Sequence, residues 1–583
     1  MLNCNIFRVS FFYNMKSYIV LGLNCVGHDT SAVIGVDGNV VAACEQERFD
    51  LNKHSRNFPV DAIKECLKIS KLRIDDIDEI ALSAVNVDII KKFYLKQAIS
   101  SNTRIEFMLN DLDRIKKLYF LEDYIRKTLG YKKKINSYKH HLCHLSSAYY
   151  ASGFKESIIF SNDGLGEIET GMLGVGNNGK INIVQRGPDY PNSLGLIYSA
   201  ITHYLGWKHH SDEGIVMGLA PFGDPYSKRK KETYIDLFRD IIIKKFFYNF
   251  EINKKWISYH QQRNTWVSKY FVEIFGEPRK PYSRILKKHK DIAAALQLRL
   301  EEVVLEILKE AKIKYKLKKL CIAGGVGLNC SLNGKIEESK LFDEIFVQPA
   351  SGDAGAALGA VYLAFANQNN NYLEVKQRTN HYLGSRYEKS TIKKFLIKKK
   401  IKHITSKNIY RDAAKLLKSG KILAWFQGAS EFGPRALGNR SILSKPYPIK
   451  CKNFLNKNVK FREAFRPFAP AVIEEKAHIY FKINQRSPHM LIASKIKKNI
   501  KKKIPAVVHV DETARIQTVS ENTNSKFYKL LKSFFELTGC PVLLNTSFNI
   551  KGQPVVNSYQ QAIETFYRTK IDILILDDFI LLK

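Results

Sequence analysis

The stretch "SYIVLGLNCVGHDTSAVIGVDGNVVAACEQER", residues 17–48, decides the fold of this chain. Its first eight residues form an apolar run that is typical of a buried strand. Two further strand-like runs follow, and Asp37-Gly38 between them indicates a tight hairpin turn. The amphipathic segment "DAIKECLKIS", residues 61–70, then predicts a short helix. The start of the chain is therefore expected to be a three-stranded meander followed by a helix.

The same pattern occurs a second time. A strand is predicted at residues 77–85, and "ESIIFSNDGLGE" (156–167) and "GMLGVGNNGKINIVQRG" (171–187) repeat the strand, the Asp-Gly turn and the hairpin. Two copies of a glycine-rich meander, each followed by helices, are typical of an actin/hexokinase-like α/β fold (the ASKHA class). We therefore predict this duplicated fold, with a nucleotide or acyl-phosphate site in the cleft between the copies.

The remaining segments predict a second domain. A long amphipathic helix is expected at residues 291–312, and a small-residue helix ends the segment 349–366. The polar stretch "NQNNNYLEV", which ends at residue 375, is typical of a linker. We place a boundary near residue 380, which gives domains at 17–380 and 381–583.

Composition limits the class of protein. The chain of 583 residues has 45% hydrophobic and 11% aromatic residues, as globular proteins do. Its nine cysteines are scattered without CxxC spacing, and the opening lacks the features of a signal peptide, so we expect a cytoplasmic protein without membrane spans. The net charge of +37 is spread along the chain, which favours solvated lysine faces and small anionic substrates over a nucleic-acid partner.

Three histidines lie close together in "KHHLCHLSSAYYASGF", residues 139–154. In a helix, His140 and His144 would share one face, which is the spacing of a paired metal ligand. His141 and His144, three apart, are a second possible pair. A helix start with incidental surface histidines is the third interpretation.

Two aspartates add carboxylates to this candidate site. Asp163 ends an apolar strand, where a turn is the simpler interpretation, and Asp353 precedes a helix, where an N-cap is the simpler one. Two imidazoles and two carboxylates together form a credible site for a divalent metal such as iron(II), zinc or manganese. The combined pattern favours the metal site.

Glycines and cations point to phosphate chemistry. In "AGGVGLN" (323–329), the amides near Gly324, Gly325 and Asn329 could approach a nucleotide closely. Guanidinium groups presented from turns suit bidentate phosphate recognition, although exposed arginines with packed stems are the alternative. The candidate phosphate-binding residues are Arg435, Arg440, Lys460, Arg462, Arg466 and Arg515, with Asn545 and Ser547 at the end of an apolar strand.

These motifs resemble a known family. In order, "GHDTSA", "HHLCHLSSA", "DGLGE", "EGIVMGLAPFG", "AGGVGLN", "GDAGAALGA", "EFGPRALGNRSI", "KFREAFRPFAP" and "LNTSFN" resemble the O-carbamoyltransferases of the nodulation-factor, cephamycin and tobramycin pathways. The resemblance runs from about residue 17 to 580. It implies an actin/hexokinase-like N-terminal domain and a YrdC-like C-terminal domain. The latter would convert carbamoyl phosphate and ATP, with Mg²⁺, into carbamoyl-adenylate, and the former would pass the carbamoyl group to a hydroxyl.

The resemblance also implies roles for individual residues. His28 and Lys53 match positions that face the transfer site and are the candidate catalytic residues. The implied ligands of the metal, which would be iron(II), are His140, His144, Asp163 and Asp353. The implied carbamoyl phosphate and ATP binders are Lys460, Arg466, Arg435, Arg440, Arg515 and Ser547. His141 would be the spare histidine.

The sequence departs from the family pattern at Ala429, Leu145 and Glu512, of which Ala429 removes one potential phosphate contact.

A tRNA-threonylcarbamoylating enzyme is the alternative function, and a non-catalytic binding protein is a third class. Hydrogenase-maturation carbamoyltransferases carry paired CxxC modules that this sequence lacks. The acceptor stays open among sugars, aminoglycosides, nodulation oligosaccharides and cell-surface glycans, and so does homodimer formation.

Overall fold

The computed structural model describes residues 17–84, 116, 118–229, 231–262, 264–378 and 380–583. Val85, the last residue of the strand predicted at 77–85, lies outside this part of the chain.

The first sheet is built from the opening meander. Its five strands have the order β3-β2-β1-β4-β5, in which β1, β2 and β3 are antiparallel neighbours and β4 and β5 add in parallel. Leu21 on β1 therefore lies between Ile34 on β2 and Ile80 on β4. The strands are β1 (Ile19–Asn24), β2 (Ser31–Val36), β3 (Asn39–Glu45), β4 (Glu79–Leu82) and β5 (Lys134–Ser137). The helices α1 (Glu47–Asp50), α2 (Val60–Ser70) and α5 (Leu121–Leu129) accompany this sheet.

The second sheet repeats the topology of the first. Its order is β14-β13-β6-β7-β8, so three antiparallel strands are again extended by two parallel ones. Its strands are β6 (Glu156–Asn162), β7 (Gly171–Asn177), β8 (Lys180–Arg186), β13 (Lys319–Ala323) and β14 (Glu344–Val347). The strands follow one another along the chain in the same spatial order in both sheets. The predicted duplication and the actin/hexokinase-like class are therefore confirmed.

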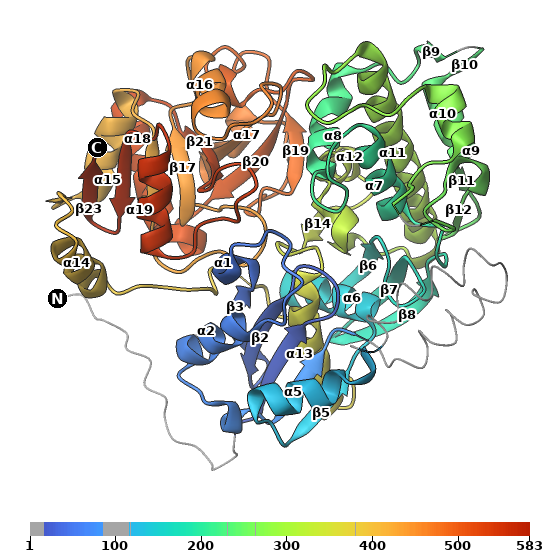
Figure 1. Cartoon of the computed structure of the whole chain (residues 1–583), viewed down its shortest axis with the longest axis horizontal. Helices are drawn as coiled ribbons and strands as arrows, with labels where there is room; N and C mark the ends of the chain where they lie inside the picture. The colour runs from blue at the N-terminus through green and yellow to red at the C-terminus, as the bar shows by residue number, and fades with distance from the viewer. Residues whose placement is uncertain (1–16, 85–115, 117, 230, 263, 379) are drawn as a thin grey trace.

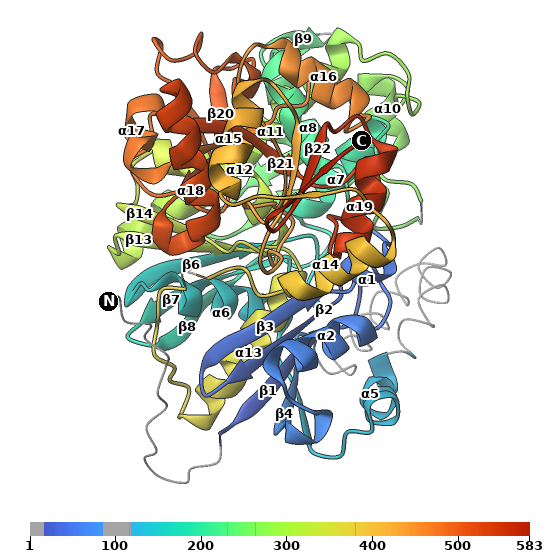
Figure 2. The same cartoon turned by 90° about the vertical axis from the view of Figure 1, so that its left-hand side faces the viewer.

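Two helices connect the sheets. α6 (His140–Ser152) and α13 (Ala354–Gln368) pack against each other between the sheets, as Figure 2 shows. The packing is close because a Cβ at Gly359 of α13 would lie 1.8 Å from the carbonyl oxygen of Cys143 on α6. Ser146 of α6 also donates to the carbonyl of Gly359 at 2.9 Å. The N-terminal ends of both helices thereby come to the same place.

A helical insertion follows β8. It forms the green lobe of Figure 1, and its longest helix, α11 (Lys287–Tyr315), extends the helix predicted at 291–312. Its other helices and strands are α7 (Leu194–Tyr204), α8 (Glu213–Leu219), η2 (Ala220–Phe222), β9 (Lys228–Arg229), β10 (Glu232–Thr233), α9 (Tyr234–Ile241), β11 (Ile242–Lys244), β12 (Phe250–Ile252), η3 (Lys254–Trp256) and α10 (Lys269–Phe275). Between β13 and β14 the chain adds η4 (Gly325–Leu328) and α12 (Cys330–Glu338).

The C-terminal part forms one mixed sheet of nine strands, in the order β15-β23-β22-β16-β17-β21-β18-β20-β19. These strands are β15 (Ile404–Thr405), β16 (Leu423–Phe426), β17 (Arg440–Ser444), β18 (Ala469–Ile473), β19 (Ile492–Lys495), β20 (Thr513–Val519), β21 (Val542–Ser547), β22 (Ile573–Leu576) and β23 (Phe579–Leu582). Its helices are α14 (Lys389–Lys398), α15 (Ile409–Lys418), α16 (Lys450–Asn458), α17 (Ala477–Tyr480), α18 (Glu521–Thr538) and α19 (Tyr559–Arg568). The boundary near residue 380 and the YrdC-like class stay predictions.

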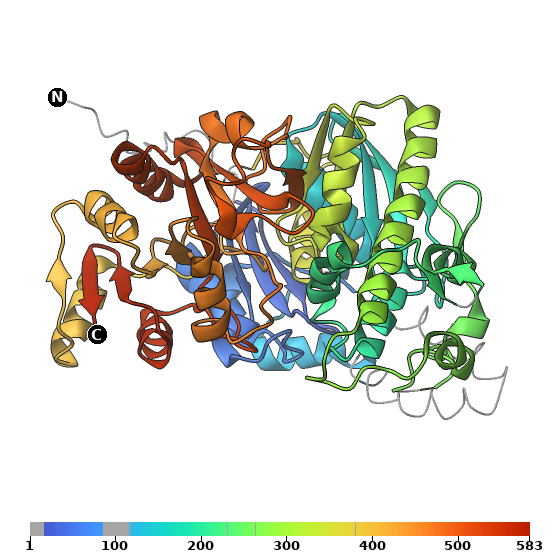
Figure 3. The ribbon, with the colours of Figure 1, turned by 90° about the horizontal axis from the view of Figure 1, so that it is seen from above.

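The C-terminal sheet packs against the helical insertion and its neighbours, as the view from above in Figure 3 shows. Asn333 on α12 donates to the carbonyl of Leu491 at 2.8 Å, and Arg48 of the first half donates to the carbonyl of Gly433 at 2.8 Å. None of the described helices combines the length and the apolar character that a bilayer crossing requires.

We predict that Gly359→Ala destabilises the protein by about 1–3 kcal/mol, because the added methyl would overlap the backbone of α6 and force α13 away from it. The midpoint of denaturant unfolding measures the effect. Gly214→Ala in α8 is the matched control, since a Cβ there meets nothing within 4 Å. Equal stability of the two variants would contradict the close packing.

Candidate functional site

Helix α6 presents two histidines at its start. His140 is its first residue and His144 lies one turn later, so both imidazoles project from the same face. Their Nε2 atoms lie 3.0 Å apart, and His144 is fully buried. Two ring nitrogens that converge so closely in a buried place are suited to share one cation.

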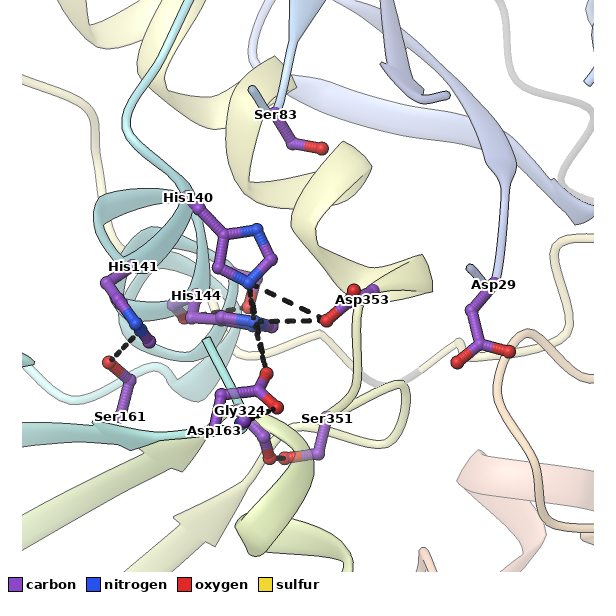
Figure 4. A network of polar contacts seen from close by, with 12 residues as sticks. Asp29, Ser83, His140, His141, His144, Ser161, Asp163, Gly324, Ser351 and Asp353 are labelled. Carbon is purple, nitrogen blue, oxygen red and sulfur yellow. Dashed lines mark hydrogen bonds and ion pairs between the residues drawn. The ribbon is translucent and has the colours of Figure 1, made fainter. Parts of the chain in front are cut away.

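Two carboxylates complete the cluster, as Figure 4 shows. Asp163, just after β6, places Oδ2 at 3.0 Å from Nε2 of His144, and Asp353, just before α13, places Oδ1 at 3.6 Å from Nε2 of His140. The ligand atoms of all four residues lie within 4.8 Å of one another. The side chain of Asp353 makes no capping hydrogen bond, so its carboxylate is free to face the cluster.

His141 takes a different direction. Its Nε2 lies 3.0 Å from the carbonyl oxygen of Glu169 and its Nδ1 lies 3.3 Å from Oγ of Ser161. Burial, followed by the neighbouring His140 and His144, holds the pKa of His141 well below its usual value. The geometry thus groups His140 with His144 and gives His141 a structural place on the second sheet.

The surroundings of the cluster fix its charges. Burial acts to lower the pKa of His140, but the Asp353 and Asp163 carboxylates outweigh it and raise this pKa to about 9. Glu167 accepts the backbone N–H of His140 at 2.7 Å, which holds the start of α6. Gly325 leaves the space beside Asp163 open, since a Cβ there would lie 2.8 Å from Oδ1.

These donors fit a divalent metal ion. Neutral imidazoles and carboxylates are the ligands of iron(II), zinc and manganese, and a buried carboxylate pair needs a compensating charge. In addition, Nδ1 of the buried His144 has no hydrogen-bond partner among the described residues. The cluster therefore fits one divalent ion, and the donor set does not select which.

His28 lies on the open side of this cluster. Its Nε2 is 3.8 Å from Oδ2 of Asp353, and its Nδ1 is 2.9 Å from Oδ2 of Asp29. The other oxygen of Asp29 lies 2.7 Å from Nδ1 of His54. Asp29 and His54 are not among the residues predicted from the sequence, although Asp29 directly follows His28, because the bridge joins residues 25 apart. Lys53, the other predicted catalytic residue, is 3.4 Å from Oγ of Ser211.

The glycine loop lies next to the cluster, but Asn329 has another task. Gly324 adopts a positive φ of 86°, and its carbonyl accepts from Ser351 at 3.0 Å. The side chain of Asn329 caps α12 by accepting from the N–H of Leu332 at 2.9 Å, and it pairs with Gln297. The side-chain amide of Asn329 is thus engaged in structural hydrogen bonds, and the nucleotide contact predicted for the main chain of this loop stays a prediction.

A second cluster, which we call the cationic cluster, lies in the C-terminal part. Lys460 is 4% exposed, and its Nζ lies 2.8 Å from the carbonyls of both Ser547 and Asn549. It also donates to Oγ of Ser547 at 3.2 Å. The members of the cationic cluster are Lys460, Arg462, Arg466, Arg435 and Arg515.

The cationic cluster is a site of unbalanced positive charge. Burial and then the neighbouring Arg462, Arg466 and Lys53 hold the pKa of Lys460 below its usual range. Burial, with Arg515 and Arg466, lowers the pKa of Arg435 to about 9. Buried cations that depress one another's pKa need an anion to be stable together. A polyphosphate or an acyl phosphate supplies such charge.

Two predicted phosphate binders make contacts within the scaffold. Arg440 is fully buried, and its guanidinium donates to four backbone carbonyls, including that of Gln427 at 2.6 Å, and stacks on Phe426. Asn545 donates to Oε1 of Gln517 at 2.8 Å within the sheet. Arg440 and Asn545 thus help to fix the strands near the cationic cluster, whereas Ser547 contacts Lys460 directly. Their phosphate contacts stay predictions.

The N-terminal part of the chain contacts the surroundings of the cationic cluster. Lys53, from the half that carries the metal candidate, lies near enough to lower the pKa of Lys460. Nε1 of Trp207 donates to Oε1 of Glu463 at 3.3 Å across the same junction. The predicted catalytic residue Lys53 thus lies within electrostatic reach of the cationic cluster.

The three residues at which the sequence departs from the family pattern lie outside the contacts described above. Leu145 is buried in the core, and Ala429 contributes its carbonyl to Asn439. Glu512 is exposed and pairs with Lys501.

Comparison with known proteins identifies relatives over most of the chain. Residues 19–362 match the family described as "Carbamoyltransferase N-terminus", and residues 414–583 match "Carbamoyltransferase C-terminus". The nodulation protein NolNO of Sinorhizobium fredii is 36% identical over 96% of this chain and 80% of its own length. An uncharacterized protein of Synechocystis is 34% identical over 97% of this chain and 96% of its own. Full-length HypF in its phosphate- and nucleotide-bound form has a TM-score of 0.33 and 12% identity over 61% of this chain and 56% of its own.

We predict that the purified protein binds one divalent metal ion per chain and that His144→Ala loses it, since this imidazole contacts both carboxylates. Elemental analysis after dialysis measures the metal content. His141→Gln is the matched control and should keep the metal, because His141 faces the sheet. A full complement in His144→Ala, or its loss in His141→Gln alone, would refute the assignment.

We predict that Arg466→Gln leaves the melting temperature of the ligand-free protein close to that of the wild type, because this half-buried guanidinium is attracted by Glu463 at 3.8 Å as well as repelled by Arg515. Added pyrophosphate should stabilise this variant less than it stabilises the wild-type protein, because stabilisation by a ligand increases with its affinity for the folded protein. Thermal scans with and without pyrophosphate measure both effects. A lower melting temperature combined with undiminished stabilisation by pyrophosphate would contradict the role of Arg466 in anion binding.

Proposed function

Since this chain belongs to the carbamoyltransferase family, we propose that it is an O-carbamoyltransferase that uses carbamoyl phosphate and ATP. The observation that carries the proposal is the buried cationic cluster, which needs bound anions, next to a candidate metal centre in the other domain. Phosphate-bearing substrates and a separate transfer site account for both.

The C-terminal domain, which we propose to be YrdC-like, forms the activated donor. Lys460, Arg466 and Arg515 bind the phosphate groups of carbamoyl phosphate and ATP, and Arg435 adds charge at the rim. Water hydrolyses carbamoyl phosphate to carbamate and phosphate, and the carbamate oxygen bonds to the α-phosphorus of ATP as the bond to pyrophosphate breaks. The products are carbamoyl-adenylate, pyrophosphate and phosphate.

The N-terminal domain passes the carbamoyl group to a hydroxyl. His140, His144, Asp163 and Asp353 hold a divalent metal, which we propose to be iron(II); when bound, it polarises the carbamoyl carbonyl or the acceptor oxygen. Asp29 pairs with Nδ1 of His28, and Nε2 lies 3.8 Å from Oδ2 of Asp353 beside the candidate metal centre, where the neutral form of this imidazole takes the proton of the acceptor hydroxyl. The new C–O bond forms as AMP leaves.

The intermediate is expected to stay inside the protein. A carbamoyl-adenylate is a mixed anhydride that water would hydrolyse, so a path between the two sites protects it. The proximity of Lys53 to Lys460 across the junction supports such a path. ATP use and the free thiols of the described cysteines support a cytoplasmic location.

A tRNA-threonylcarbamoylating enzyme is the alternative, which the net charge of +37 favours. Such an enzyme would require threonine and bicarbonate and would ignore carbamoyl phosphate. The deciding experiment measures AMP, ADP and pyrophosphate from ATP with and without carbamoyl phosphate. We expect AMP and pyrophosphate only when carbamoyl phosphate is present, with acceleration by the correct acceptor. ADP as the sole product, or cleavage that does not need carbamoyl phosphate, would overturn the proposal.

We predict that Lys460→Met reduces the formation of AMP at least about 100-fold, because a buried charge-assisted contact to substrate is worth a few kcal/mol. The metal content should be unchanged, since the two sites lie in different domains. Lys457→Met is the matched control, because Lys457 is exposed on the same helix end. Normal AMP release from Lys460→Met would exclude this lysine from the reaction.

A further inference from the structure

Four heteroaromatic side chains gather beside the candidate metal centre. We call His203, His209, His210 and Trp266 the heteroaromatic platform. The ring centroids of His209 and Trp266 lie 4.4 Å apart, and those of His209 and His210 lie 4.9 Å apart. His203 is exposed and the other three are half-buried, so the platform faces solvent along one side.

The ring nitrogens of the platform lack partners. None of them hydrogen-bonds to another described residue, and Nδ1 of His209 is buried without a partner. Protein structures satisfy nearly all buried polar atoms, so the unpartnered Nδ1 of His209 is unusual for a purely structural cluster, and the other three rings are half-buried or exposed. These atoms are available to accept from and donate to a bound molecule.

The platform is continuous with the reacting centre. The ring of His210 lies 6.1 Å from the ring of His28, whose Nε2 approaches Asp353 at 3.8 Å. Asp163 also acts on the pKa of His210, which places this imidazole within electrostatic reach of the metal candidate. A molecule that lies on Trp266 and His209 could therefore extend one group past His210 toward His28.

The platform is held in a defined shape. His203 lies in α7 and Trp266 precedes α10, whereas His209 and His210 lie in the loop between α7 and α8, where Gly206 turns the chain with a φ of 81°. Carboxylates then fix the backbone: Asp212 accepts the N–H of Lys208 at 3.1 Å, and Glu213 accepts the N–H of His210 at 2.6 Å. A rigid loop positions rings for a ligand better than a mobile one.

The electrostatics of the platform select among ligands. Burial lowers the pKa of His209 to about 4 and that of His210 to about 3, so both rings are neutral at pH 7. The positive charges of Lys208 and Arg56 also lower the pKa of His209, and Lys53 lies nearby at Ser211. None of these three cations forms an ion pair with another described residue. A polycationic ligand would be repelled here, whereas a neutral or acidic one would not.

We propose that the heteroaromatic platform is the acceptor subsite and that the acceptor is a neutral or acidic carbohydrate, not an aminoglycoside. A sugar ring has an apolar face of C–H groups that covers an aromatic ring, and hydroxyls at its edge that pair with ring nitrogens. Trp266 would stack on the sugar, His209 would bind its hydroxyls, and the reacting hydroxyl would reach His28. This inference rests on the proposed carbamoyl transfer.

Binding can be tested without ATP or carbamoyl phosphate. The full-length protein is applied to an array of neutral and uronate-containing glycans, and kanamycin serves as the polycationic probe in calorimetric titration. We expect selective glycan binding and no binding of kanamycin. Trp266→Ala should weaken the best glycan about tenfold or more, because an aromatic contact contributes about 1 kcal/mol beyond its buried area. Trp266→Phe should retain most of the affinity, and Phe246→Ala, an exposed aromatic in another loop, is the matched control.

Activity assays separate this inference from the function on which it rests. With the best glycan as acceptor, Trp266→Ala should raise KM, while carbamoyl phosphate-dependent AMP formation without acceptor stays normal in every variant. Binding of kanamycin, absence of glycan binding, or unchanged glycan affinity in Trp266→Ala would overturn the carbohydrate subsite. Absence of carbamoyl phosphate-dependent AMP in the wild-type protein would instead overturn the proposed function.

Discussion

The contact between α6 and α13 is the constraint on which the rest of the N-terminal domain depends. Gly359 lets the two helices approach until only backbone separates them, and this approach brings their N-terminal ends together. His140 and Asp353 meet for this reason, although the sequence places them in different halves of the duplication. Because β6 ends at the same point, Asp163 completes the group. One helix packing contact therefore sets the geometry of the candidate metal centre.

The C-terminal domain shows the opposite principle. Its site is assembled from groups that repel one another, and burial together with this repulsion depresses the pKa values of Lys460 and Arg435. Hydrogen bonds within the scaffold hold the cations in place. The guanidinium of Arg440 donates to backbone carbonyls, and the side-chain amide of Asn545 donates to Gln517. Excess positive charge destabilises the site when it is empty. A bound phosphate neutralises this charge, so the relief of the repulsion adds to the free energy of binding.

The junction of the domains gives the two sites their relationship. Contacts such as Trp207 to Glu463 and Asn333 to Leu491 join the helical insertion to the C-terminal sheet. Lys53 reaches toward Lys460 from the N-terminal side, and His209 and His210 of the heteroaromatic platform lie on the loop that also carries Ser211, the partner of Lys53. Donor formation, transfer and the proposed acceptor subsite therefore share one region of the molecule.

The sequence by itself determined the duplicated meander, the helical face that His140 and His144 can share, and the charge of the C-terminal site, because strand alternation, helical period and residue type are local properties. Only the tertiary structure decided which histidine is the spare, that Asp29 bridges His28 and His54, and that Arg440 and Asn329 serve the scaffold. It also brought Trp266 to His209, 57 positions away in the printed sequence. Side-chain direction and burial depend on distant segments, and no local pattern encodes them.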